Sequence, residues 1–153
     1  IKYTDVNNTL WSSNYIGYVT SKGIMTGVTP KEFKPSKNMT RAEFATVIVR
    51  YLKLTDSKVT VTKFVDIKGR WYETNANVLV SYGYINGLPD GTFGGNKAIT
   101  RAEVCKILNS ALGKEITEDE LERYTKEVTD KYKDIESFRW YFKDVVKAVV
   151  DIK

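Results

Sequence analysis

The residues with the clearest capacity for chemistry are two copies of the tetrapeptide Thr-Arg-Ala-Glu, at residues 40–43 and 100–103. A Thr followed three residues later by Glu is a capping box, so each copy predicts the start of a helix. Arg41 and Arg101 then occupy the first helical position, where the positive end of the helix dipole disfavours a cation by about 0.3–1 kcal/mol. The repetition of this unfavourable placement suggests that each guanidinium faces an anion.

Lysines add to the positive charge at these two helix starts. Lys37 and Lys97 each lie three residues before the Thr of the tetrapeptide. A guanidinium beside unpaired helix N–H groups is a good site for a carboxylate or a phosphate. We therefore predict an anion-binding site at each box. The alternative is an ion pair inside the protein, with an acidic residue of the neighbouring sequence repeat.

Three tryptophans also recur at matched places. Trp11, Trp71 and Trp140 each follow an Asp-Val or Asp-Ile pair, five or six residues after the Asp. On an amphipathic helix such residues are predicted to face the core. Because an indole can also present one face to a sugar ring, the three tryptophans are candidate ligand-binding residues as well.

The loops that precede the two boxes contain further candidates. Gly27 and Gly87 occupy matched positions, are expected to provide backbone freedom or a close approach, and are candidate ligand-binding residues. Asp90 lies in the turn Pro89-Asp90-Gly91 of the second loop. A calcium site there is disfavoured because the regular acidic spacing of an EF-hand is absent.

Composition excludes several classes of function. The chain has no His and a single cysteine, Cys105, which removes His-based catalysis and ligation, so we predict no cofactor and no metal site. Glu43 and Glu103 resemble the carboxylate pair of a glycosidase, but capping accounts for both. The net charge of +5 is spread along the chain without a basic helix, which argues against nucleic acid. No apolar run is long enough for membrane insertion.

The repeated residues define the organisation of the chain. Each full repeat reads as helix, loop and helix, and period-two alternation is confined to residues 59–62, so the predicted fold class is all-α. We expect the opening helices, which carry the three tryptophans, to converge in a three-helix bundle and bury stripes that no repeat can bury alone. The prediction is a single domain over 1–153, with repeat one at 1–55, repeat two at 62–114, a linker helix at 117–131 and a partial third repeat at 132–153.

These motifs resemble those of S-layer homology domains. The resemblance rests on Asp90-Gly91-Thr92-Phe93 and Ile99-Thr100-Arg101-Ala102-Glu103, together with the Asp…Trp openings and the paired glycines. It implies a non-enzymatic anchor, usually of three tandem motifs in a pseudo-threefold architecture. In that architecture the first helices form the central bundle, and the loop-plus-second-helix units project as prongs.

The resemblance also implies a location and a ligand. Such domains hold extracellular proteins to the bacterial cell wall, with the cargo fused in the same parent chain. The usual ligand is a secondary cell-wall polysaccharide, often with a pyruvate ketal on N-acetylmannosamine. The ketal carboxylate is the kind of anion that the two arginines require. The alternative function is a protein–protein interaction module of a bacterial surface assembly.

The sequence departs from the family pattern in two places that bear on binding. The first loop reads Pro30-Lys31-Glu32-Phe33 where the family has Asp-Gly-Thr-Phe, so Arg101 is expected to contribute more than Arg41. The third repeat keeps Asp134 and Trp140 but lacks the loop and the Arg box. At most two anion sites of this type are therefore predicted.

Overall fold

The computed structural model describes residues 2–55 and 64–150, and within these residues it is built of helices without a strand. One isolated bridge joins Thr40 to Ala98. The prediction of an all-α fold is confirmed, while the period-two segment 59–62 lies outside the described residues. The helices are α1 (Ser13–Ser21), α2 (Arg41–Leu52), α3 (Glu73–Ser81), α4 (Arg101–Ala111), α5 (Glu118–Lys131) and α6 (Phe142–Val149).

Three helices begin at capping boxes. In each box the Thr hydroxyl accepts a hydrogen bond from the amide of the third following residue at 3.2 Å, and the Glu at that position accepts one from the Thr amide. The caps are Thr40 for α2, Thr100 for α4 and Thr117 for α5. Because each box satisfies helix-end N–H groups locally, these helix starts follow from the sequence alone.

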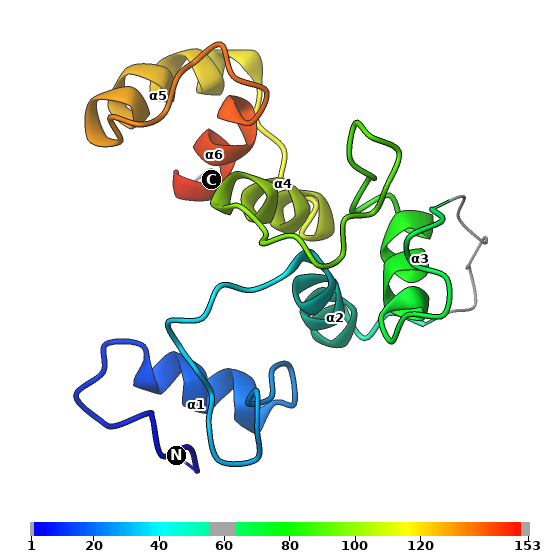
Figure 1. The fold of residues 1–153 in the computed structure, drawn as a ribbon. Helices are drawn as coiled ribbons and strands as arrows, with labels where there is room; N and C mark the ends of the chain where they lie inside the picture. Colours follow the sequence, from blue (N-terminus) through cyan, green and yellow to red (C-terminus); the bar gives the residue numbers. More distant parts are fainter. Residues whose placement is uncertain (1, 56–63, 151–153) are drawn as a thin grey trace.

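The helices pack in pairs that cross the boundary between repeats. The opening helix α3 packs against α2, and the opening helix α6 packs against α4 and α5. Figure 1 shows the second helices α2 and α4 in the middle of the molecule, with the other helices around them. The predicted central bundle of opening helices is therefore wrong for the described residues, in which α1, α3 and α6 do not pack together.

The tryptophans explain why that prediction failed. The N-caps of α1, α3 and α6 come after the tryptophans, which stand on the preceding turns. Trp11, Trp71 and Trp140 are 83%, 66% and 61% exposed, so the prediction that they face the core is also wrong. Without its indole, the buried stripe of α1 is reduced to Ser13 and Ile16. That stripe is too small to hold three helices together.

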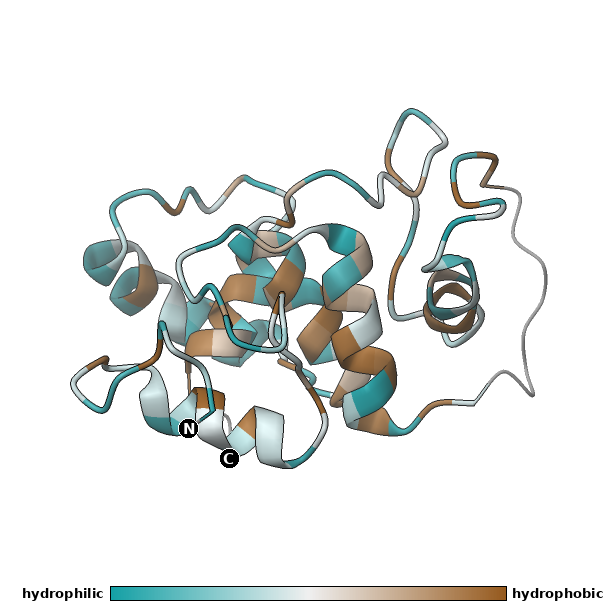
Figure 2. Ribbon diagram, turned by 60° about the horizontal axis from the view of Figure 1, so that its bottom comes forward, coloured by the Kyte–Doolittle hydropathy of each residue, from teal (hydrophilic) through white to brown (hydrophobic). Residues whose placement is uncertain are grey.

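Apolar side chains gather in three separate clusters. The largest joins α2, α3 and α4 around Ile48 and Phe93, and Figure 2 shows apolar residues on the inward sides of the central helices. A second cluster lies between α5 and α6 around Val146. The third is small and packs Ile16 of α1 against Phe33 of the following loop. The cluster around α1 is therefore joined to the main core, the cluster of α2, α3 and α4, by few apolar contacts.

An aspartate in each full repeat holds the loop that follows the opening helix. The Asp5 carboxylate accepts hydrogen bonds from the amides of Phe33 and Lys34 at 2.9 and 2.7 Å. Asp66 makes the same pair of bonds in the second repeat, with the amides of Phe93 and Gly94, both at 2.9 Å. Asp134 forms no such bond within the described ranges. The recurring Asp is thus the residue that shapes each loop, a role that its position in the motif does not by itself reveal.

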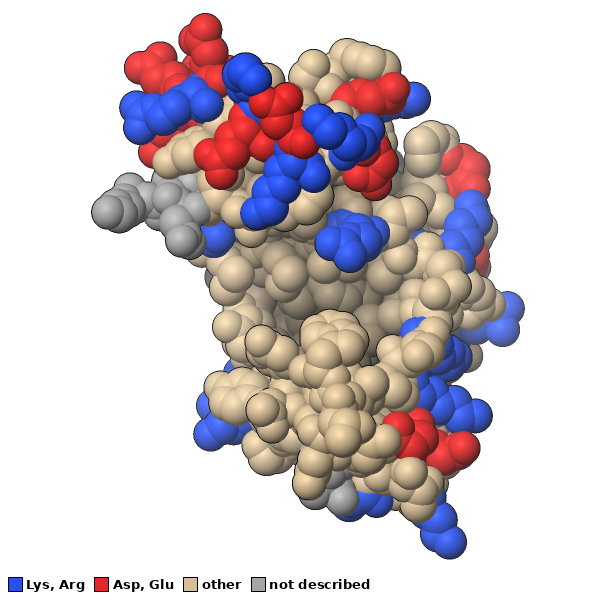
Figure 3. All heavy atoms as spheres, turned by 90° about the vertical axis from the view of Figure 1, so that its left-hand side faces the viewer, with Lys and Arg blue, Asp and Glu red and all other residues tan. Residues whose placement is uncertain are grey.

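Charge is unevenly distributed over the surface. Figure 3 shows basic and acidic side chains mixed over α5 at the top of that view, and a mostly uncharged hollow below it. No basic stripe of the kind that tracks a nucleic acid appears on this face. Between residues 2 and 55 and between 64 and 150, no helix is long and apolar enough to span a membrane.

Candidate functional site

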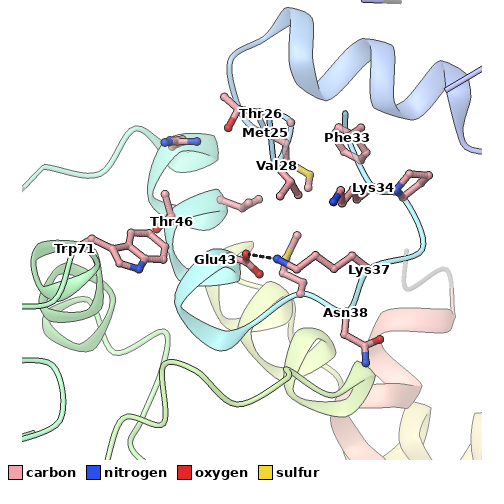
Figure 4. A pocket seen from close by; sticks show the side chains of 15 residues that line it. Met25, Thr26, Val28, Phe33, Lys34, Lys37, Asn38, Glu43, Thr46 and Trp71 are labelled. Atoms are coloured by element: carbon pink, nitrogen blue, oxygen red, sulfur yellow. Dashed lines mark hydrogen bonds and ion pairs between the residues drawn. The ribbon is translucent and has the colours of Figure 1, made fainter. Parts of the chain in front are cut away.

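The first candidate site, groove one, lies between repeat one and the opening turn of repeat two. It has a volume of about 390 Å³ and joins the first loop, one side of α2 and Trp71. Figure 4 shows Trp71 at one end of the groove, with Thr46 beside it and Phe33 and Lys37 across the opening. Its lining includes Gly27, Phe33, Lys34, Lys37, Glu43, Arg50 and Trp71.

The second candidate site, groove two, lies between repeat two and the opening turn of the third repeat. It has a volume of about 320 Å³ and joins the second loop, one side of α4 and Trp140. Its lining includes Arg41, Gly87, Glu103, Lys106, Ile107 and Trp140. Cavities of this size match small-molecule or saccharide sites.

The two grooves are built from equivalent positions of successive repeats. Gly27 corresponds to Gly87 and Glu43 to Glu103, each at an offset of 60. In both grooves the aromatic wall comes from the next repeat, because α3 packs on α2 and α6 packs on α4. The packing that overturned the predicted bundle therefore also forms the grooves.

Arg41 lies at the base of groove two, where it connects the two repeats. Its side chain is 4% exposed and forms an ion pair with Glu103. Its Nε donates to the carbonyl of Phe93 at 3.0 Å, and one terminal nitrogen donates to the carbonyl of Asn86 at 3.1 Å. The alternative of an ion pair with the neighbouring repeat is thus the one observed. The inference that Arg41 lacks a counter-ion within the chain is wrong.

The backbone N–H groups at the start of α2 also have partners in the second loop. The amides of Arg41 and Ala42 donate to the carbonyls of Lys97 and Gly95 at 2.9 and 3.0 Å. The second loop therefore caps α2 with its backbone. Only two of the five guanidinium N–H groups of Arg41 are left for a ligand, since three are used inside the fold.

Arg101 has different surroundings from Arg41. It is exposed, forms no ion pair with a described residue and lines neither groove. Anion binding at Arg101 stays a prediction.

The other predicted site residues are divided between groove and surface. Lys37 lines groove one, where its Nζ lies 3.0 Å from a carboxylate oxygen of Glu43. Lys97 lies outside both grooves and pairs with Asp90 at 3.1 Å on the tip of the second loop. Trp11 also lies outside both grooves and contacts Tyr15, with ring centroids 6.3 Å apart. Trp71 and Trp140 are the two tryptophans that line grooves.

Gly27 and Gly87 are required by close approaches inside their own repeats. A Cβ on Gly27 would lie 2.6 Å from the carbonyl oxygens of Thr29 and Glu32. A Cβ on Gly87 would collide with the ring of Phe64. The groups that approach both glycines belong to the protein itself, and a close approach to a ligand stays a prediction. Each glycine nevertheless lines its groove, which leaves backbone atoms there unshielded.

Two carboxylates near the grooves are held ionised by their neighbours. Burial would raise the pKa of Glu43, but the Thr40 amide and the Lys37 ammonium outweigh it and place that pKa below its ordinary 4.5. At the loop tip the Thr92 hydroxyl and amide lower the pKa of Asp90 from 3.8 to about 2. Neither group is therefore a proton donor at neutral pH.

The candidate catalytic groups among the described residues have other roles. Glu43 and Glu103 are both engaged, as capping partners and as ion-pair partners of Lys37 and Arg41. Burial raises the pKa of the Cys105 thiol, which makes it a poor nucleophile. Within the described ranges no three His, Cys, Asp or Glu side chains gather closely enough to hold a metal ion.

Two groove residues, Arg50 and Lys106, are not among the predicted site residues. The recurrence of motifs does not point to them, because neither cation is repeated 60 residues away. Ser110 stands at the position that corresponds to Arg50, and Thr46 stands at the position that corresponds to Lys106. A signal was nevertheless present. Positions 46 and 50 are four residues apart and share one helix face, so each second helix carries one cation on the same stripe.

A helical repeat protein with a ligand-sized groove at each repeat junction is a binding module, and its family follows from comparison with known proteins. The family model of the S-layer homology domain matches residues 2–45 and 63–105. These segments contain both tetrapeptide boxes and make up more than half of the chain. The chain therefore belongs to the S-layer homology domain family, as its motifs predict, and is a cell-surface module.

Relatives of known name agree with this assignment. The chain is 34% identical over 97% of its length to cell surface glycoprotein 1 of Acetivibrio thermocellus, and 31% identical over 98% to the cellulosome-anchoring protein of the same organism. It is 36% identical over 69% of its length to an S-layer protein of Bacillus licheniformis. The chain spans only 6%, 33% and 12% of these three relatives, respectively.

Proposed function

We propose that this chain is a non-catalytic module that anchors a larger protein to the bacterial cell wall by binding an anionic secondary wall polysaccharide in grooves one and two. The observation that carries the proposal is the repetition of the groove at equivalent positions, each with an exposed indole from the next repeat. Exposed indoles beside polar groups are the usual platform for a sugar ring.

Each groove offers the polymer a similar set of contacts. We assign the packing of a sugar face to Trp71 in groove one and to Trp140 in groove two. The loop backbone around Gly27 and Gly87 offers groups that can bond to hydroxyls. Repeated weak sites on one module favour a polymeric ligand, because two linked contacts bind more tightly than either alone.

The net charge of the module supports an anionic polymer, and we propose a pyruvylated one. The chain carries +5, and groove one contains three cations, Lys34, Lys37 and Arg50, against one carboxylate, Glu43. A ketal carboxylate next to a sugar ring would satisfy both the charge and the aromatic wall. The much greater length of the relatives supports a cargo fused to the module in the same chain.

The test is a pull-down with purified cell walls of Acetivibrio thermocellus, before and after extraction of the polymer that is not peptidoglycan. We expect the chain to be retained on intact walls and lost from extracted ones. The double variant Trp71→Ala/Trp140→Ala should lose retention, whereas Trp11→Ala, which changes an exposed tryptophan outside the grooves, should keep it. Retention on extracted peptidoglycan, or on wall protein alone, would contradict the proposal.

A further inference from the structure

Each groove contains one cation that no carboxylate of the described residues neutralises. In groove one it is Arg50, and in groove two it is Lys106. Neither forms an ion pair with any residue of the described ranges, whereas Lys37 in groove one is held by Glu43. The helix dipole accounts for a cation in the last turn of α2 but not for Lys106, which lies in the middle of α4.

Each of these cations shares its groove with an indole. The Nζ of Lys106 lies 5.5 Å from the ring centroid of Trp140. Arg50 lines the same groove as Trp71. A cation beside an exposed aromatic face provides two contacts that a neutral sugar cannot use together: the ring packs on the indole, and a charged substituent meets the cation.

We propose that Arg50 and Lys106 are the specificity-determining residues of grooves one and two, and that each binds the anionic substituent of a sugar unit that packs on Trp71 or Trp140. The inference rests on the proposed function and deepens it, because it transfers the anion from the tetrapeptide arginines to the middle and end of the second helices. Arg41 keeps its part as the connector beneath groove two.

The two grooves therefore bind the anion at different depths. Arg50 stands four residues beyond the position that corresponds to Lys106, on the same helix face. Four residues of α-helix rise about 6 Å, so the substituent lies about one turn further from the helix start in groove one than in groove two. The same repeating polymer would thus engage the two grooves in different registers.

The experiment is calorimetric titration with a methyl glycoside of pyruvylated N-acetylmannosamine and with the same glycoside without its ketal. The variants are Arg50→Gln, Lys106→Gln and the double variant, with Arg123→Gln on exposed α5 as a matched loss of charge outside the grooves. We expect each single variant to weaken the ketal-bearing probe about tenfold at its groove, and the double variant to lose the preference for the ketal. Arg50→Lys and Lys106→Arg should retain it.

The outcomes separate the inference from the function on which it rests. A preference for the ketal that survives in the double variant would overturn the inference, and so would equal binding of the two probes by the unchanged chain. In both cases retention on intact walls would keep the anchoring function. Failure of the unchanged chain to bind walls would remove the function itself.

Discussion

Arg41 and Arg101 occupy the same position in their tetrapeptides but differ in their surroundings. Arg41 is buried and contacts Glu103, Phe93 and Asn86 of the next repeat, whereas Arg101 is exposed. Removal of Arg41 would take a charge-assisted bond from Glu103, which is partly buried and keeps its Thr100 partners, and would leave the carbonyls of Phe93 and Asn86 without this donor. The two side chains therefore contribute very differently to stability.

Substitution at these two positions tests that difference. We expect Arg41→Ala to lower the free energy of unfolding by about 2 kcal/mol, through the loss of a partly buried ion pair and two further hydrogen bonds. Arg101→Ala should change it by a few tenths of a kcal/mol at most, because an unfavourable dipole contact is removed. Denaturant unfolding measures both. Equal effects would show that Arg101 also has a partner in the fold.

The pH dependence of stability tests the turn around Asp90 at the tip of the second loop. Because the folded pKa of Asp90 is lowered to about 2 by Thr92 and then by Lys97, the folded state binds fewer protons than the unfolded state. The contribution of Asp90 to stability is thus complete above its ordinary pKa of 3.8 and is lost as the pH falls towards 2. The Thr92 amide signal in an NMR titration should move with a midpoint near 2. In Asp90→Asn the transition should vanish, and a midpoint near 3.8 in the unchanged chain would contradict the turn geometry.

At the scale of elements, each helix with a capping box begins where contacts within four consecutive residues fix its start. A single substitution in the box therefore tests that start. Thr117→Ala removes the cap of α5, an exposed helix whose one buried residue is Val128. We expect a loss of about 1 kcal/mol of stability by thermal unfolding. Thr117→Ser, which keeps the hydroxyl, is the control and should retain most of it. No loss in the alanine variant would mean that α5 is held by packing alone.

At the scale of the molecule, the separation of the apolar clusters predicts that the main core can fold without α5 and α6, although α6 packs on α4. The cluster of α2, α3 and α4 contains no residue from α5 or α6, whose own cluster is distinct. We expect deletion of residues 114–153 to leave a chain that still unfolds cooperatively, with a smaller denaturant dependence because less surface is buried. Near-ultraviolet circular dichroism reports whether packing around Tyr72 and Phe93 survives. A chain without a cooperative transition would show that α6 is needed for the main core.

Local sequence features are sufficient to predict three helix starts, the fold class and the family of this protein. The capping boxes of α2, α4 and α5 depend on contacts between residues three apart, and the repeated motifs identify both the all-α class and the family. The candidate status of Trp71, Trp140 and Lys37 also came from recurrence, and these residues do line the grooves. Features of this kind need no knowledge of which helices touch.

Only the tertiary structure determines which residue pairs with Arg41 and which helices pack together. Glu103 neutralises Arg41 from 62 residues away, and nothing local to residue 41 distinguishes it from Arg101. The sequence predicts that the tryptophans face the core because an apolar stripe does not show where its helix begins. In the structure each helix begins after its Trp. Packing of each opening helix on the second helix of the preceding repeat then turns Trp71 and Trp140 into groove walls and leaves Trp11 outside them. Periodicity identifies the apolar face of a helix, but the partner of that face depends on the packing of the whole chain.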